Sequence, residues 1–145
     1  MTATKASRFE LAAQLRADCH VLGRLPLSHV LLLDKREVPW FILVPETGVI
    51  ELCDLDDTEH AQLQREVNAL CRCVRARFQV TKLNVAAIGN IVSQLHVHVI
   101  GRHPQDPWWP HVAWGQTSAG GYADAEVSAI AQRVAAELGA DFQSL

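Results

Sequence analysis

The segment Gln94-Leu-His-Val-His-Val-Ile100 alternates polar and apolar side chains, and it contains two histidines that could do chemistry. In a β-strand, successive side chains point to opposite faces. Gln94, His96 and His98 would then share one face, at intervals of about 6.5 to 7 Å. A row of polar groups inside a small sheet is costly unless the groups meet partners or a ligand. The alternation therefore predicts a functional site on this face of the strand.

Two chemistries and one purely structural role are compatible with the paired histidines. Imidazole binds zinc, iron or copper, but a metal site needs further ligands, and no spacing rule selects the nearby candidates His103, His111 and Asp106. Alternatively, a neutral imidazole attacks phosphorus and becomes a phosphoramidate, while its neighbours hold its tautomer and contact the phosphate oxygens. In the structural role, both histidines are simply hydrogen-bonded sheet residues. The pattern by itself leaves all three interpretations open.

The strand that carries the histidines needs an element to cover its other face. Leu95, Val97 and Val99 would form the apolar face of a strand over residues 95–100. After Asp56-Asp57-Thr58-Glu59, apolar residues recur at spacings of three and four, which predicts a long helix with one apolar stripe. The residues of the stripe are Leu63, Val67, Leu70, Val74 and Phe78. We expect this stripe to pack against the apolar face of the sheet.

Several short strands and two further helices complete the predicted elements. Strands are predicted at residues 20–22, 28–33, 40–44, 49–52 and 82–87. The early connections are too short for parallel crossovers, so we expect an antiparallel sheet. Ser7 and Glu10 have the spacing of a capping box, which predicts a first helix ending near Asp18. Residues 103–121 are predicted to form an ordered loop or lid, and residues 122–138 a helix.

Length and composition are those of one globular domain. The chain has 145 residues, of which 49% are hydrophobic and 20% are charged, and its net charge is −3. We therefore expect a single α+β domain over residues 1–145. Its antiparallel sheet of about five strands would be covered by one long packing helix and a C-terminal helix.

Charge, cysteine spacing and hydropathy argue against several classes of protein. Lysine and arginine are scattered and form no basic stripe, so no nucleic-acid partner is expected. The four cysteines form no C-x-x-C pair, which argues against a disulfide framework or a structural zinc site. The early residues are charged, and no apolar run approaches the roughly 20 residues of a membrane span. These features predict a cytoplasmic protein that does not enter a membrane.

The histidine segment resembles the signature of the histidine triad (HIT) family, in which histidine alternates with apolar residues three times. In this alignment Gln94 takes the first histidine position, His96 the position of the central nucleophile, and His98 the third position. The downstream Trp108-Trp-Pro110 and Trp114-Gly115 resemble the ending of a bacterial subgroup that also carries Gln-x-His-x-His.

Upstream segments resemble other parts of the family pattern. Leu83-Asn84 and Gly89-Asn90 are similar to the strand and turn that meet the phosphate. Leu31-Leu-Leu-Asp34 and Pro39-Trp-Phe-Ile-Leu-Val-Pro45 are similar to the paired strands of the nucleoside pocket. The resemblance covers about residues 7–116, and residues 117–145 would form a C-terminal lid and helix.

The resemblance implies a HIT-like fold and a nucleotide-binding hydrolase or nucleotidyl transferase that acts at the α-phosphorus. His96 would hold the nucleotide covalently, while His98 and Gln94 contact the phosphate oxygens and His98 helps to protonate the leaving group. The implied nucleotide-binding residues are Asn84, Gly89, Asn90 and Asp34, with Asp34 on the ribose. No metal or cofactor is required, because imidazole is the nucleophile. Relatives are commonly homodimers, so we expect a homodimer here.

Gln94 is the main departure from the family pattern. Glutamine supplies an amide N–H and a carbonyl, but it cannot donate from a charged imidazolium. Two alternatives to an enzyme follow from this departure. One is a non-catalytic module that binds a nucleotide through a degenerate triad, and the other is a metal-binding protein that uses His96 and His98.

Overall fold

A six-stranded antiparallel sheet forms the centre of the protein, with the strand order β4-β5-β3-β2-β1-β6. The computed structural model describes residues 8–145, so the capping box predicted at Ser7 lies outside the described residues. The strands are β1 (Cys19–Arg24), β2 (Ser28–Leu33), β3 (Trp40–Pro45), β4 (Lys82–Ala86), β5 (Val97–Arg102) and β6 (Gln143–Ser144). The predicted α+β class is confirmed, with one more strand than expected.

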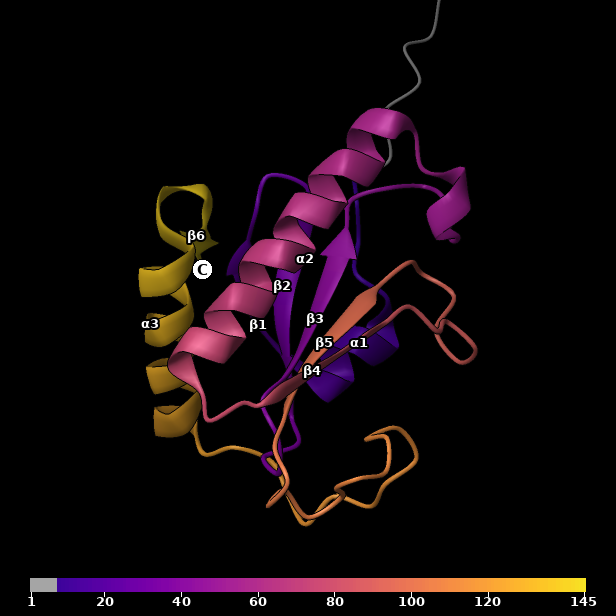
Figure 1. Ribbon diagram of the computed structural model, residues 1–145. Coiled ribbons are helices and arrows are strands. Elements are labelled where there is room, and N and C mark those ends of the chain that lie inside the picture. Colours follow the sequence, from indigo (N-terminus) through magenta and orange to yellow (C-terminus); the bar gives the residue numbers. More distant parts are fainter. Residues whose placement is uncertain (1–7) are drawn as a thin grey trace, which may run out of the picture.

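Three α-helices accompany the sheet (Figure 1). They are α1 (Ala13–Asp18), α2 (Asp57–Arg77) and α3 (Asp124–Leu138), with short 3₁₀ helices η1 (Leu52–Asp54) and η2 (Gly139–Asp141). A capping box starts α2, because the Asp56 carboxylate accepts from the Glu59 amide at 2.8 Å and the Glu59 carboxylate accepts from the Asp56 amide at 3.4 Å. Within residues 8–145, no helix is long and apolar enough to cross a bilayer.

The two faces of the sheet are covered by different parts of the chain (Figure 1). One face packs against α2 and α3, and its core includes the predicted helix stripe from Leu63 to Val74 together with Leu95, Val97 and Val99. The other face packs against α1 and the loop that follows β5. The predicted packing of the long helix on the histidine strand is therefore confirmed, and His98 lies on the opposite face, toward the loop.

Three predictions about individual elements are wrong. Residues 49–52 form no strand but lead into η1, because β3 already has β2 and β5 on its two sides. The histidine strand begins at Val97 rather than Leu95, because the last pairs it makes with its neighbours are Val97 with Leu43 of β3 and His98 with Ala86 of β4. The first helix begins only at Ala13. The short β6, which sequence patterning did not predict, pairs with the end of β1.

Candidate active site

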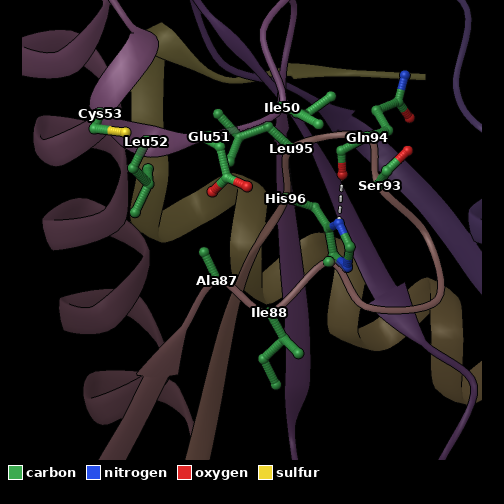
Figure 2. A pocket seen from close by; sticks show the side chains of 11 residues that line it. Ile50, Glu51, Leu52, Cys53, Ala87, Ile88, Ser93, Gln94, Leu95 and His96 are labelled. Carbon is green, nitrogen blue, oxygen red and sulfur yellow. Dashed lines mark hydrogen bonds between the residues drawn. The ribbon is translucent and has the colours of Figure 1, made fainter.

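The His96 ring is held by the backbone immediately before β5 and is 7% exposed. Its Nδ1 lies 2.6 Å from the carbonyl oxygen of Gln94, as the dashed line in Figure 2 shows. A carbonyl oxygen only accepts, so Nδ1 carries the proton and donates it to this hydrogen bond. In the neutral ring, Nε2 then keeps its lone pair. His96 therefore presents one nitrogen that can act as a nucleophile.

His98 has the opposite tautomer, because its partner is a donor. The indole Nε1–H of Trp40 donates to His98 Nδ1 at 2.9 Å, and indole nitrogen cannot accept. The proton of the neutral His98 ring is therefore on Nε2. Burial, followed by the charge of His96, lowers the pKa of His98 to about 4. The two rings, with centroids 4.9 Å apart, thus pair a nucleophilic nitrogen with a neutral hydrogen-bond donor.

His96 lies on the boundary between two cavities. The larger has a volume of about 570 Å³ and is lined by both histidines, by Gly89 and Asn90, and by Trp114. The smaller has a volume of about 250 Å³, and Figure 2 shows the side chains that line it. These include His96, Gln94 and residues 50–53 of the segment before α2. A ligand bound across this boundary would place its central atoms beside His96.

Gln94 lies two residues before His96 in the segment that leads into β5. Its side-chain oxygen accepts from the Ala12 amide at 2.8 Å, and its side-chain nitrogen donates to the Glu10 carbonyl at 2.9 Å. Both polar groups of Gln94 are therefore bonded to the segment that leads into α1. Of the three residues predicted to share a strand face, only His98 lies on β5, because Gln94 and His96 both precede its first residue.

Two other predicted residues lie outside the linings of both cavities. The side-chain oxygen of Asn84 accepts from Arg102 at 3.0 Å. The Asp34 carboxylate accepts from the Tyr122 amide at 2.9 Å and from His20 at 2.8 Å, and these two hydrogen bonds lower its pKa. The structure thus places Gly89 and Asn90 in the same cavity lining as the histidines, whereas the side chains of Asn84 and Asp34 make hydrogen bonds outside both cavities.

Sequence reasoning missed two features of this site, the hydrogen bond from Trp40 to His98 and the presence of Asp18. Trp40 was read only as part of a pocket wall, and no local signal marks its bond to His98. Asp18, at the end of α1, lines the larger cavity together with Gln14. Trp114 also lines it, and its indole nitrogen is buried without a hydrogen-bond partner in the described part of the chain. Trp40 and Asp18 come from segments remote in sequence from the histidine strand, so local pattern could not have grouped them with it.

A buried ion pair anchors the loop that carries Trp108 and Trp114. Arg102 Nε and Nη2 donate to the two carboxylate oxygens of Asp106 at 2.7 and 3.0 Å, and Nη2 also donates to the His111 carbonyl at 2.9 Å. Burial alone would raise the pKa of Asp106, but the hydrogen bonds from Arg102 and from the Trp108 amide hold it below its usual value. The loop is therefore fastened to the last residue of β5.

The metal-binding alternative meets two obstacles in this geometry. A ligand nitrogen needs a free lone pair, and the lone pair of neutral His98 is on Nδ1, where the Trp40 hydrogen bond already uses it. Asp106, one of the three candidate further ligands, accepts from Arg102 with both oxygens. Among the residues that the structure describes, no group of three histidine, cysteine or acidic side chains is arranged to hold a metal ion.

Comparison with known proteins decides the family. Residues 14–105 match the family model described as the HIT domain, which is more than half of the chain. The chain belongs to the histidine triad family. This membership confirms the resemblance drawn from the sequence and assigns the chain to a superfamily of nucleotide-binding hydrolases and transferases.

Three bacterial histidine triad proteins of known structure resemble the chain over nearly its whole length. The protein from Bradyrhizobium japonicum is 35% identical, with a TM-score of 0.86, and the match covers 90% of this chain and 98% of that one. The protein from Sinorhizobium meliloti 1021 is 35% identical, with a TM-score of 0.87, and the match covers 89% of this chain and 96% of that one. The protein from Marinobacter aquaeolei VT8 is 37% identical, with a TM-score of 0.86, and the match covers 90% of this chain and 96% of that one. Among curated proteins, none matches the chain.

The low pKa of His98 makes the stability of this HIT domain depend on pH. A histidine in the unfolded chain binds its proton near pH 6.5, whereas His98 in the folded protein binds it only near pH 4. Between these values the unfolded state holds more protons, so this contribution to the free energy of unfolding falls as pH falls. We expect the wild type to lose roughly 2 kcal/mol more stability than His98→Asn between about pH 7 and pH 4.5.

Urea unfolding of the two proteins across this pH range measures the difference. Asparagine is chosen because its side-chain oxygen can accept from Trp40, so the comparison removes the titrating ring and retains an acceptor. Parallel stability curves for the two proteins would show that His98 is protonated as readily in the folded state as in the unfolded state.

Proposed function

We propose that this protein is a nucleotide hydrolase or nucleotidyl transferase that acts at the α-phosphorus of a nucleoside phosphate derivative through a covalent nucleotidyl-His96 intermediate. The hydrogen bond from His96 Nδ1 to the Gln94 carbonyl is the observation that carries this proposal, because it leaves the Nε2 lone pair of the neutral ring free. That nitrogen belongs to a ring on the boundary of two cavities, where a phosphorus between a nucleoside and a leaving group would lie.

The reaction has two half-reactions. In the first, the Nε2 lone pair of His96 forms a bond to the α-phosphorus, and the bond from phosphorus to the leaving group breaks with its electrons going to that group. The Nδ1 proton stays on the hydrogen bond to the Gln94 carbonyl. In the second, water or another hydroxyl bonds to phosphorus, its proton passes to solvent, and the electrons of the phosphorus–nitrogen bond return to Nε2.

The larger cavity would hold the nucleoside. A volume of about 570 Å³ is in the usual range for small-molecule sites, and Leu33, Ile42 and Val92 supply apolar surface for a base. We propose that Gly89 and Asn90 contact the phosphate and that Asp18, which lines the same cavity, meets the ribose hydroxyls. The contacts of Asp34 indicate instead that it holds the chain before α3.

Three residues would support the reaction without forming the bond to phosphorus. His98 would donate its Nε2–H to a phosphate oxygen. Gln94 would act through its backbone carbonyl on His96 and through its side chain on the segment before α1. Asn84 would help to hold Arg102 and the loop beyond it. None of these roles requires a cofactor or a metal ion.

Intact-mass spectrometry tests the proposal directly. The protein is incubated briefly with a diadenosine polyphosphate and quenched without acid, because phosphoramidate bonds are labile in acid. A mass increase of one adenylyl group is the expected result. Nucleotide binding without an adduct or product would instead support the alternative of a non-catalytic binding module.

We further propose a homodimer, because β4 is an edge strand beside exposed apolar side chains. Val85 on β4 is 47% exposed, and Ile88 and Ile91 in the following loop are 45% and 95% exposed. Unpaired strand edges and apolar surface both favour association. Analytical ultracentrifugation at micromolar concentration should give twice the mass of the chain, and Val85→Lys should shift the equilibrium toward monomer. A wild-type monomer at this concentration would refute the assembly.

A further inference from the structure

Trp40 and His98 form a buried donor–acceptor pair across neighbouring strands. They lie on β3 and β5, which pair through Ile42 and His98, and Trp40 is 2% exposed. Trp108 and Trp114 pack edge-on against the Trp40 ring, with centroids 6.4 and 5.6 Å away. The surrounding aromatic rings therefore fix the direction of the indole N–H toward His98 Nδ1, 2.9 Å away.

We propose that Trp40 is a positioning residue that keeps His98 as an Nε2–H hydrogen-bond donor and prevents it from giving a proton to the leaving group. The site would then select nucleoside phosphate derivatives whose leaving group departs as a stable oxyanion. This inference rests on the proposed function at His96, and it adds to that function the chemical class of the leaving group.

The argument begins with the proton that a histidine acid must carry. A neutral imidazole N–H is far too weak an acid to give up its proton near pH 7, so His98 would have to be cationic. The cation carries a proton on Nδ1 as well as on Nε2. That proton would point at the indole N–H of Trp40, and the hydrogen bond between the two residues would be lost. The buried indole N–H would then be left without an acceptor.

The surroundings of His98 do not compensate a cation. The ring also packs edge-on against Trp114, with centroids 5.4 Å apart, and against His96. The other titratable side chain that lines the same cavity is Asp18, whose carboxylate accepts from Gln14 at 2.8 Å. Lys35 lies over the Trp40 ring and adds positive charge on that side. The lowered pKa of His98 agrees with these contacts.

The missing acid determines which leaving groups depart readily. An oxygen of a phosphate chain leaves with the bonding electrons as an anion stabilised by resonance and needs no proton. An amine must gain a proton before or during departure, and neither His98 nor the amide of Gln94 supplies one. We therefore expect efficient turnover of nucleoside polyphosphate derivatives and poor turnover of nucleoside phosphoramidates.

A series of aryl esters of AMP measures this requirement, because the acidity of the leaving phenol varies while the nucleotide stays the same. For the wild type, kcat/KM should fall steeply from the 4-nitrophenyl to the phenyl ester. In Trp40→Phe, His98 loses the donor at Nδ1 and can become a cationic acid. The ratio of kcat/KM for the two esters should then shrink by roughly tenfold or more.

Trp114→Phe is the matched control, since it removes an indole that also touches His98 but makes no hydrogen bond to it. The ester ratio should stay at the wild-type value in this variant. A shallow dependence on the leaving group in the wild type, or the same loss of steepness in both variants, would overturn the inference. If the wild type turns over none of the esters, the proposed function itself fails, and the leaving-group class with it.

A long-range ¹H–¹⁵N correlation spectrum of the wild type tests the tautomer independently of turnover. The His98 ring should give the pattern of a neutral imidazole protonated on Nε2, and the His96 ring that of one protonated on Nδ1. The His98 pattern should persist well below pH 6. A His98 ring protonated on Nδ1 would overturn the assignment to Trp40 even if the protein is active and Trp40→Phe does not fold.

Discussion

His96→Ala is expected to abolish the nucleotidyl adduct and to lower turnover by roughly four orders of magnitude or more, in line with the loss of a covalent nucleophile. The reason is local, because His96 provides the ring nitrogen at the cavity boundary that has both a free lone pair and a fixed ring orientation. His98 cannot replace it, since its Nε2 carries a proton and its Nδ1 is occupied by Trp40.

Nucleotide affinity should change much less than turnover in this variant. Most of the lining of the larger cavity is untouched, so the dissociation constant of a nonhydrolysable analogue should stay within about tenfold, or about 1.4 kcal/mol. Isothermal titration and intact-mass spectrometry on the same preparation measure the two properties side by side. His111→Ala serves as a control, because it removes an exposed ring from the loop after β5.

Either of two results would end the proposal of covalent catalysis by His96. One is turnover at the wild-type rate in His96→Ala, and the other is an adduct that persists in it. Loss of both binding and turnover would point instead to a collapsed site, which the unfolding curve of the variant would reveal. The His111→Ala protein should form the adduct like the wild type.

Asp106→Ala should cost about 3 to 5 kcal/mol of folding stability, because it leaves the guanidinium of Arg102 buried without its counter-charge. The side chains of this pair are 2% and 0% exposed, and two hydrogen bonds join them. A loss of this size is a large fraction of the stability of an ordinary domain. It should also release the loop that carries Trp108 and Trp114 and so weaken the packing around Trp40 and His98.

Urea unfolding measures this loss, and an exposed ion pair supplies the comparison. Glu10 and Arg16 form a pair at 3.2 Å with side chains that are 75% and 50% exposed, so Glu10→Ala should cost less than about 1 kcal/mol. A double variant, Arg102→Met with Asp106→Leu, should recover part of the stability because no unpaired charge remains. A loss below about 1 kcal/mol in Asp106→Ala would show that the buried charge is not confined as the structure indicates.

The sequence was sufficient for features that depend on neighbours along the chain. The spacing of apolar residues from Leu63 to Val74 predicted α2 and its buried stripe, because helical periodicity is a local property. The alternation around His96 and His98 predicted two histidines close together and an apolar face beneath them. The resemblance of the same segment to the histidine triad signature identified the family.

The chemical state of the site was decided only by tertiary structure. The tautomer of His98 depends on Trp40, 58 residues away in the chain, and the side chain of Gln94 is taken up by backbone groups 82 and 84 residues away. The start of β5 likewise depends on its pairing with β3 and β4, which come from other parts of the chain. Hydrogen bonds between residues that are distant in sequence produce no periodicity along the chain. The sequence pattern therefore predicts which residues lie close together, but not which ring nitrogen of each histidine carries the proton.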